Sequence, residues 1–175
     1  MIEFRCLRCR KCCQNLFRET PYGLNGLALF SNEIQLFSQK EIYPFHGIGK
    51  SPDDEKFKIS VYQLGVKNYP HLNDNGCTIY SKRPLACKSY PFEPFRIAPD
   101  GEIQLTFDVE CTGILELQGR NPSEFADGKI SAPVELRYCL ILLEKVAKIQ
   151  QEEELKWSFD LQTKKWKQDK IIKIK

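Results

Sequence analysis

The stretch CLRCRKCC at residues 6–13 decides the fold, because it sets Cys6, Cys9, Cys12 and Cys13 in the pattern CxxCxxCC. Two residues between cysteines let one tight turn present both sulfurs to the same metal, while backbone N–H groups donate hydrogen bonds to those sulfurs. Adjacent cysteines point in different directions in most backbones, so one of Cys12 and Cys13 serves a second metal or is a spare or reactive thiol. The sequence therefore predicts a metal site in this segment.

A second cysteine element, CTIYSKRPLACKSYP, occupies residues 77–91. Asn75-Gly76 is a turn signal that leads into Cys77, and Pro84 can begin a helical turn that presents Cys87. Both thiols can then face one centre. The ten-residue separation of the two cysteines does not fit a zinc ribbon, which needs a second CxxC, and the N-terminal run lacks the Cys-Pro that continues a bacterial ferredoxin motif.

Three further side chains of this element are candidate cofactor contacts. Tyr80 and Tyr90 are placed to exclude water from a metal centre, which would tune its potential or its stability. Arg83 either pairs with an anionic centre or forms an ordinary surface ion pair. Asp108 and Glu110 follow the element and either support a nearby ligand or face water, and the sequence leaves both alternatives open.

The two cysteine elements together resemble the YkgJ-type cysteine cluster proteins, which are described as zinc- or iron-chelating and often labelled iron–sulfur cluster proteins. The resemblance covers about Cys6 to Cys111. Tyr69 stands where many members have a further cysteine, and His71 is a candidate nitrogen ligand in its place, although a single histidine in a loop more often binds no metal. The resemblance implies metal-binding roles for seven cysteines: Cys6, Cys9, Cys12, Cys13, Cys77, Cys87 and Cys111.

Composition places the chain among ordinary globular proteins, with 175 residues, 42% hydrophobic and 28% charged. A chain of this length has a sufficient core without disulfides, so its eight cysteines need another explanation. No membrane span and no secretory signal is apparent, so we expect a cytoplasmic protein with reduced thiols, and a disulfide-tied protein is the weaker alternative. The formal net charge of +3 falls further if four thiolates bind a metal, and gives no reason to expect nucleic acid as a partner.

The remaining pattern predicts one α+β domain over residues 1–175, with small antiparallel sheets and one long helix around a cysteine-rich metal centre. Residues 1–30 and 69–113 are expected to form the metal site. Residues 155–175 are expected to form a basic C-terminal strand region, whose lysines protect a sheet edge. The expected elements in the first half of the chain are an irregular segment over 1–30, a short helix capped at Ser31-Asn32-Glu33 and ended by Tyr43-Pro44, a loop from Gly47 to Pro52 and one or two strands within Lys56–Val66. Further along, they are a hairpin of Phe92–Ile97 and Glu102–Val109 around Pro99-Asp100-Gly101, a polar loop over 121–128 and a helix from Pro133.

Two residues that could be mistaken for site residues receive structural interpretations. Cys139 lies on the apolar stripe of the long predicted helix, where a free cysteine usually behaves as a small buried hydrophobe. His46 has no partner apparent in the sequence and is not assigned to the site.

Three functions remain open at this point. The first is an iron–sulfur protein, with 4Fe-4S as the expected cluster in preference to 2Fe-2S, because seven candidate thiolates exceed the four that a structural zinc needs. It would have an electron-transfer or redox role and an unknown redox or protein partner. The second is a zinc-stabilised structural or interaction module. The third and weakest follows from a similarity to flagellin lysine N-methylases, which suggests a methyltransferase-related enzyme, but no fingerprint for a methyl donor is present.

Overall fold

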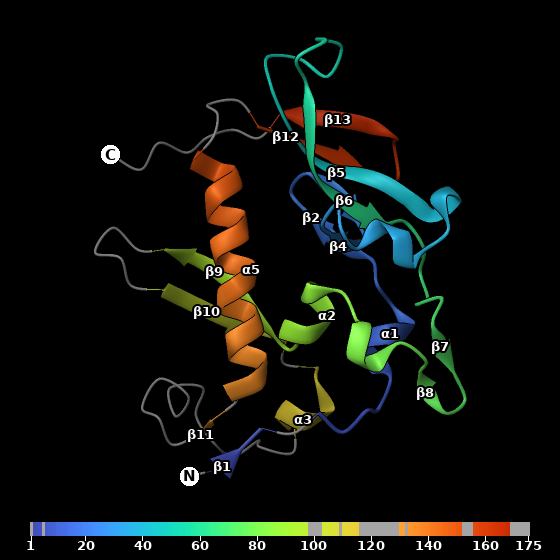
Figure 1. Cartoon of the computed structure of the whole chain (residues 1–175), viewed down its shortest axis with the longest axis vertical. Helices are drawn as coiled ribbons and strands as arrows, with labels where there is room; N and C mark the ends of the chain where they lie inside the picture. The colour runs from blue at the N-terminus through green and yellow to red at the C-terminus, as the bar shows by residue number, and fades with distance from the viewer. Residues whose placement is uncertain are drawn as a thin grey trace. The chain divides into compact units, whose positions relative to one another are not determined.

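A computed structural model describes residues 2–4, 6–97, 103–108, 110–115, 130–131, 133–151 and 156–168 of the chain (Figure 1). The chain divides into two compact units. Unit 1 comprises Met1–Cys13 and His71–Lys145, and unit 2 comprises Gln14–Pro70 and Val146–Lys175. The predicted α+β class with small antiparallel sheets is confirmed. All seven cysteines predicted to bind metal belong to unit 1, whereas residues 14–30, which the sequence analysis grouped with them, belong to unit 2.

Unit 2 is built on a five-stranded sheet in the order β13-β12-β5-β6-β4, with every neighbouring pair antiparallel. The strand predicted within Lys56–Val66 is confirmed as β6. Within the predicted basic region 155–175, β13 lies at one edge of the sheet, where the exposed Lys165 discourages pairing with another chain. The strands of the sheet are β4 (Leu27–Leu29), β5 (Ile42–Ile48), β6 (Lys58–Leu64), β12 (Lys156–Asp160) and β13 (Lys165–Gln168).

The prediction of an irregular segment up to Phe30 is wrong between residues 18 and 29. β2 (Arg18–Thr20) pairs with β3 (Gly23–Asn25) in a hairpin, and β4 follows at once in the five-stranded sheet. Strands of three residues are too short to show an alternating pattern in the sequence. Gly23 has a φ of +118°, and the Asp160 side chain occupies the space that a β-carbon there would need. This glycine therefore serves a close approach between two strands.

The short helix predicted after Ser31 is replaced by two single-turn 3-10 helices, η1 (Ile34–Leu36) and η2 (Gln39–Glu41). The backbone is extended at Phe37 between them. This extension buries the Phe37 ring, which meets the Tyr69 ring edge-on at a centroid distance of 5.7 Å. The expected side-chain cap is also absent at Glu33, whose carboxylate instead accepts a hydrogen bond from the Phe30 N–H at 2.9 Å.

The expectation that Tyr43-Pro44 ends an element and that Gly47 lies in a loop is wrong, because both positions lie inside β5. The pairing of β5 with β6 shifts register between Pro44 and His46 and again between His46 and Gly47. Such irregularities tolerate a proline, which has no N–H to donate to a ladder. At Gly47 the Phe57 ring fills the space that a β-carbon would take, so a tertiary contact explains this glycine.

Gln63 is completely buried in unit 2 and has all of its polar groups satisfied by the backbone. Its amide nitrogen donates to the carbonyls of Pro44 and Phe159 at 2.7 and 3.0 Å. Its amide oxygen accepts from the Gly26 N–H at 2.7 Å. One side chain thus joins β5, β6, β12 and the segment between β3 and β4.

Asp160 is the second buried polar residue that organises unit 2. Burial alone would raise the pKa of its carboxyl, but hydrogen bonds from Lys167, Thr163 and the backbone hold this pKa well below the usual range. The Lys167 ammonium lies 3.0 Å from Oδ2, and the Leu24 N–H donates to Oδ1 at 3.0 Å. The carboxylate therefore ties β3 to both strands of the β12–β13 hairpin.

His46 has the structural role that the sequence analysis gave it. Its ring stacks on Phe45 at a centroid distance of 4.0 Å, and its Nδ1 lies 3.1 Å from Oγ of the buried Ser158.

Unit 1 combines short strands and helices around a small apolar core. The predicted hairpin over 92–109 is confirmed as the antiparallel pair β9 and β10, while its turn at Pro99-Asp100-Gly101 and the polar loop over 121–128 lie outside the described residues. The elements that contribute to unit 1 are β1 (Ile2–Glu3), α1 (Lys11–Gln14), β7 (Leu72–Asn73), β8 (Gly76–Cys77), η3 (Tyr80–Lys82), α2 (Leu85–Ser89), β9 (Phe92–Ile97), β10 (Ile103–Phe107), α3 (Thr112–Leu115), β11 (Ile130–Ser131) and α5 (Pro133–Gln151).

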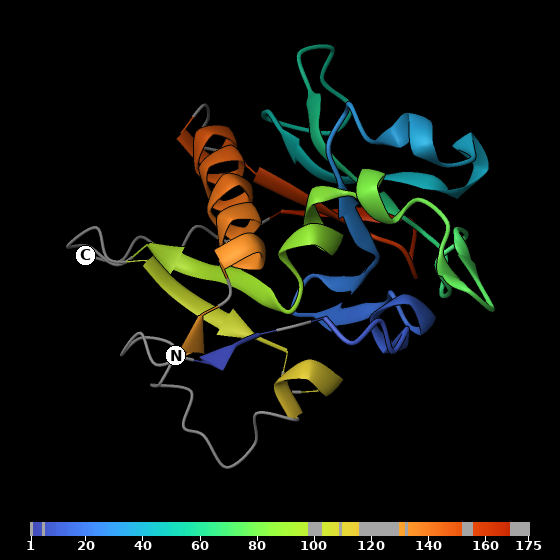
Figure 2. The ribbon, with the colours of Figure 1, turned by 60° about the horizontal axis from the view of Figure 1, so that its bottom comes forward.

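The core of unit 1 consists of Phe4, Phe92, Cys111, Ile114 and Cys139. Both views of the chain show α5 beside the β9–β10 hairpin, and Cys139 of α5 packs in the same cluster as Phe92 of β9 (Figure 2). Cys139 is fully buried, which confirms its predicted role as a core residue. Across the described residues, no helix has both the length and the apolar character to span a bilayer.

Candidate metal centre

The N-terminal cysteine segment is coiled by two residues in the left-handed region. Arg8 has a φ of 52° and Arg10 a φ of 69°, a conformation that costs a non-glycine residue about 1–2 kcal/mol. Turns of this kind direct successive backbone N–H groups toward a common anion. Consistent with this, the Lys11 N–H donates a hydrogen bond to the Cys9 sulfur, and the Cys13 N–H donates to the Arg10 carbonyl at 2.9 Å. Such outliers are typical of functional loops.

The second cysteine element has the local structure that its sequence predicts. Gly76, with a φ of +108°, turns the β7–β8 hairpin so that Cys77 ends β8. Pro84 precedes α2, and its carbonyl accepts the N–H of Cys87 at 3.0 Å, which places this cysteine in the first turn. The guanidinium of Arg10 donates to the Asp74 carbonyl at 3.1 Å and so joins the first cysteine element to the hairpin.

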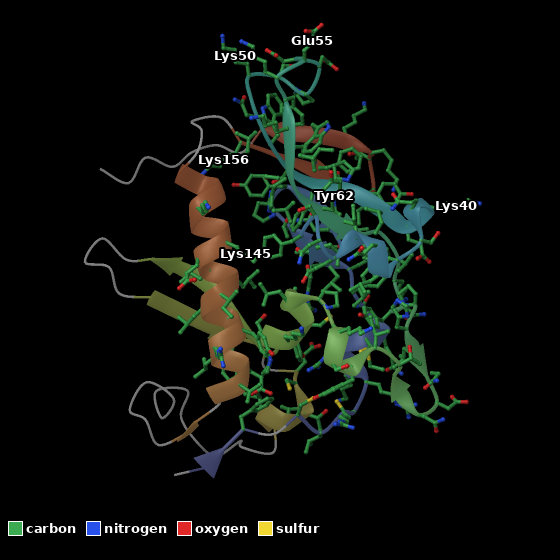
Figure 3. All side chains as sticks on the ribbon, viewed as in Figure 1. Lys40, Lys50, Glu55, Tyr62, Lys145 and Lys156 are labelled. Carbon is green, nitrogen blue, oxygen red and sulfur yellow. The ribbon has the colours of Figure 1, made fainter. Side chains whose placement is uncertain are left out.

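The seven predicted ligand thiols of unit 1 act on one another electrostatically. Cys12 and Cys13 are closest, with their sulfurs 4.0 Å apart. Cys77 and Cys87 act on Cys13, while Cys9 acts on Cys12, and Cys6 and Cys12 act on Cys111. Figure 3 shows the sulfur atoms, in yellow, beside α1, α2 and α3. The thiols of the first and second cysteine elements and of Cys111 therefore lie near one another. We call these seven residues the cysteine neighbourhood.

The adjacent thiols of Cys12 and Cys13 shift each other's pKa. The hydrogen bond between them is the largest influence on both pKa values, raising that of Cys12 and lowering that of Cys13. The positive charge of Arg83 lowers both. When the pair shares one proton, the proton therefore stays on Cys12, and Cys13 carries the thiolate, the form that binds metal.

Thr112 connects Cys9 to the element that carries Cys111. Partial exclusion of water raises the pKa of the Cys9 thiol, but hydrogen bonds from the N–H groups of Lys11 and Thr112, together with the Lys11 charge, contribute to lowering it below its usual value. The sequence analysis did not identify Thr112 as a site residue. Its position directly after Cys111 is the only signal that the sequence offers.

Cys111 differs from the other predicted ligands because it is buried in the core of unit 1. Burial raises the pKa of its thiol more than hydrogen bonds from the Ile114 and Gly113 N–H groups lower it, and the charges of Cys12 and Cys6 raise it further. Cys6, Cys9 and Cys12 are exposed by contrast. The cysteine neighbourhood thus extends from the apolar core to the surface of unit 1.

The Tyr80 ring holds two guanidinium groups, one from each cysteine element. Arg83 lies 3.7 Å and Arg8 lies 4.4 Å from its centroid, and Arg83 Nε also donates to the Tyr80 carbonyl at 2.9 Å. Cation–π contacts of this kind contribute about 0.5–2 kcal/mol each. Arg83 is therefore positioned by Tyr80, from where its charge reaches Cys12 and Cys13.

Tyr90 is close to both the cysteine neighbourhood and the core of unit 1. It packs against the apolar cluster, and burial, the charge of Asp108 and a hydrogen bond with Asp108 raise the pKa of its phenol. Asp108 also accepts the Glu110 N–H at 2.9 Å, while Glu110 itself is exposed. Asp108 thus supports Tyr90 and its own turn, and Glu110 faces water.

The two residues considered as replacements for a missing cysteine belong to different units. Tyr69 is buried in unit 2 against Phe37. His71 begins the hairpin segment of unit 1, where its carbonyl accepts the N–H of Thr78 at 2.9 Å and the Thr78 hydroxyl at 3.2 Å. A ligand role for His71 stays a prediction.

The chemistry of the donor set fits a thiophilic metal or cluster. Thiolates are the ligands shared by structural zinc and iron–sulfur centres, and N–H groups that donate to sulfur accompany both. Within the described part of the chain, no group of three or more His, Cys, Asp or Glu side chains is already arranged to hold a metal ion.

Comparison with known proteins identifies one family. The profile of the family described as "CxxCxxCC: Putative zinc- or iron-chelating domain" matches residues 5–112, a range that contains all seven predicted ligand cysteines. No curated protein and no solved structure matches the chain.

Proposed function

The chain belongs to the CxxCxxCC family of zinc- or iron-chelating domains, and from this premise we propose that unit 1 holds an iron–sulfur cluster with an electron-transfer or redox role. The observation that carries the proposal is the number of thiols in one neighbourhood. Seven cysteines act on one another through Cys12, Cys13 and Cys111, whereas one structural zinc uses four ligands. A 4Fe-4S cluster is the proposed form.

The thiols of both cysteine elements and of Cys111 are the proposed ligands. A bound cluster would supply one-electron transfer. The N–H groups of Lys11 and Thr112 donate to Cys9, which stabilises negative charge on sulfur. Arg83 offsets the charge of Cys12 and Cys13, and Tyr90 packs against the core that contains Cys111.

The test is metal and acid-labile sulfide analysis of the full chain purified without oxygen, together with a visible absorption spectrum. We expect iron and sulfide in equal amounts and a brown solution that dithionite bleaches. Stoichiometric zinc in a colourless protein would contradict the proposal and indicate a zinc-stabilised module, because zinc has no redox chemistry and no visible absorption.

A matched pair of substitutions separates ligands from structural cysteines. Cys87→Ser should lower the iron content strongly, because this residue is a proposed ligand in α2. Cys139→Ser should leave it unchanged, because Cys139 is buried in α5 within the apolar core. Equal iron loss in both variants would mean that iron content follows folding of unit 1 and does not identify the ligands.

A further inference from the structure

The exposed side of the cysteine neighbourhood carries an unusual combination of side chains. Cys6, Cys9 and Cys12 are exposed, and Leu7 between them is an exposed large hydrophobic residue with 42% of its surface accessible. A partner that docked over these sulfurs would also cover the Leu7 side chain, as apolar side chains are covered in the core of a protein interface. Sulfurs at the surface also shorten the path along which an electron would leave.

Basic residues from both cysteine elements surround this surface. Arg8 and Arg83 share the Tyr80 ring, Lys11 acts on Cys9, and Arg83 acts on Cys12 and Cys13, so these charges lie beside the sulfurs. Arg10 and Lys82 are exposed next to them in the chain. We define the basic face by six residues: Leu7, Arg8, Arg10, Lys11, Lys82 and Arg83.

No acidic residue occurs in either cysteine segment, 6–13 or 75–92. Asp74 and Glu93 directly flank the second segment, and Asp108 and Glu110 precede Cys111, with Asp108 engaged with Tyr90. The two segments contain six basic residues. A 4Fe-4S core of charge 2+ bound by four thiolates carries only two negative charges. The segments therefore stay positive when such a cluster is bound.

We propose that the basic face is the docking surface for an acidic one-electron-transfer protein. This inference rests on the proposed function and adds the chemistry of the partner. Complementary charge raises the rate of encounter, and transient redox complexes form through small interfaces. The exposed Leu7 supplies an apolar contact, and the basic side chains of the face supply electrostatic steering.

A protein fits the basic face better than nucleic acid does. Proteins that bind single strands stack bases on aromatic rings beside a positive groove. The aromatic ring at the basic face is that of Tyr80, and it already stacks with the guanidinium groups of Arg8 and Arg83. An exposed leucine amid the charges suits an apolar protein contact and has no equivalent in a phosphate backbone.

The experiment measures binding of an oxidised plant-type 2Fe-2S ferredoxin, an acidic redox protein, to the anaerobically purified full chain by calorimetry. We expect binding at low salt that weakens at least tenfold at high salt. Lys82→Glu should weaken it about five- to tenfold, and Leu7→Ser should weaken it with little change in salt dependence. Lys50→Glu is the matched control, because Lys50 is exposed in the β5–β6 loop of unit 2 (Figure 3) and should leave binding unchanged.

Several results would overturn the inference. These are equal weakening by Lys82→Glu and Lys50→Glu, no salt dependence, no ferredoxin binding, or displacement of ferredoxin by equimolar single-stranded DNA. Arg8→Glu provides a second variant of the face, and iron content is measured in each protein. Because binding of oxidised ferredoxin needs no electron transfer, it is read separately from reduction of the chain by dithionite. Failure of dithionite to reduce the chain contradicts the proposed function, whereas failure of ferredoxin binding contradicts the docking surface.

Discussion

The two units of this chain differ in what organises their interiors: hydrogen-bonded polar side chains in unit 2, and thiols in unit 1. In unit 2 the buried Gln63 and Asp160 find hydrogen-bond partners within the unit, from β3 to β13. In unit 1 two of the five core residues are cysteines, and seven thiols lie near one another. Unit 2 is therefore expected to be stable on its own contacts, and unit 1 to depend on what its thiols bind.

The largest expected effect comes from metal removal. A chelator should destabilise unit 1 by on the order of 10 kcal/mol, because the binding free energy of a structural metal is also folding free energy. Both tryptophans, Trp157 and Trp166, lie in unit 2, so their fluorescence reports on that unit alone. Circular dichroism of the helices, mainly α5, follows unit 1. Loss of both signals together would remove the distinction between the units.

The second effect is specific to unit 2. Asp160→Asn removes the charge that Lys167 and three other donors stabilise, and should cost about 2–4 kcal/mol in the free energy of unfolding read by tryptophan fluorescence. Metal content should not change. A loss below 0.5 kcal/mol, on the scale of ordinary surface substitutions, would show that Asp160 does not organise the sheet.

The same carboxylate predicts a pH dependence. Because the pKa of Asp160 is lower in the folded protein than in the unfolded chain, its contribution is complete above the ordinary aspartate pKa of about 4 and is lost as the pH falls below that value. The stability difference between the wild type and Asp160→Asn should therefore be constant from pH 7 to 5 and shrink at lower pH. A difference that grows on acidification would have the wrong sign.

A third substitution separates packing from ligation inside unit 1. Cys139→Ser places a hydroxyl in the apolar core and should cost about 1–3 kcal/mol, while the metal content stays unchanged. Cys139→Ala tests the same position without a polar group and should cost less. Metal loss in Cys139→Ala would show that this cysteine has been assigned to the wrong class.

The smallest predicted effect concerns the turn that presents Cys77. Gly76 has a φ of +108° and no atom within 4 Å of the position of a β-carbon. Gly76→Ala should therefore cost only backbone strain, about 1 kcal/mol, in unit 1. Gly76→Pro is the severe counterpart, because its φ is incompatible with this turn. No change in either variant would mean that the hairpin does not need this geometry.

The comparison also shows which features a sequence can reveal. The cysteine spacing, the β9–β10 hairpin and the burial of Cys139 are local patterns, and they were predictable. Pro44 and Gly47 were misread because their environment is set by strand pairing and by the Phe57 ring, which are distant in the sequence. Local capping signals suggested one helix after Ser31, but burial of Phe37 requires an extended break.

The polar network of unit 2 and the contact of Thr112 with Cys9 were not predictable for the same reason. Asp160 meets Leu24 across 136 positions of sequence, and nothing near either residue marks the other. Thr112 contacts a cysteine of the first element only because the fold brings α3 to it. Single-sequence patterns identify donor types and turns, but partners that are distant in sequence require the folded chain.

The most direct test of the difference between the units is hydrogen exchange, followed by mass spectrometry, of the full chain with and without metal. Metal should increase protection in residues 6–13, 76–92 and 111–115 of unit 1 and leave β5 and β6 of unit 2 unchanged. Equal changes in both units, or protection in the cysteine segments that does not depend on metal, would contradict the claim that unit 1 alone is organised by its thiol ligands.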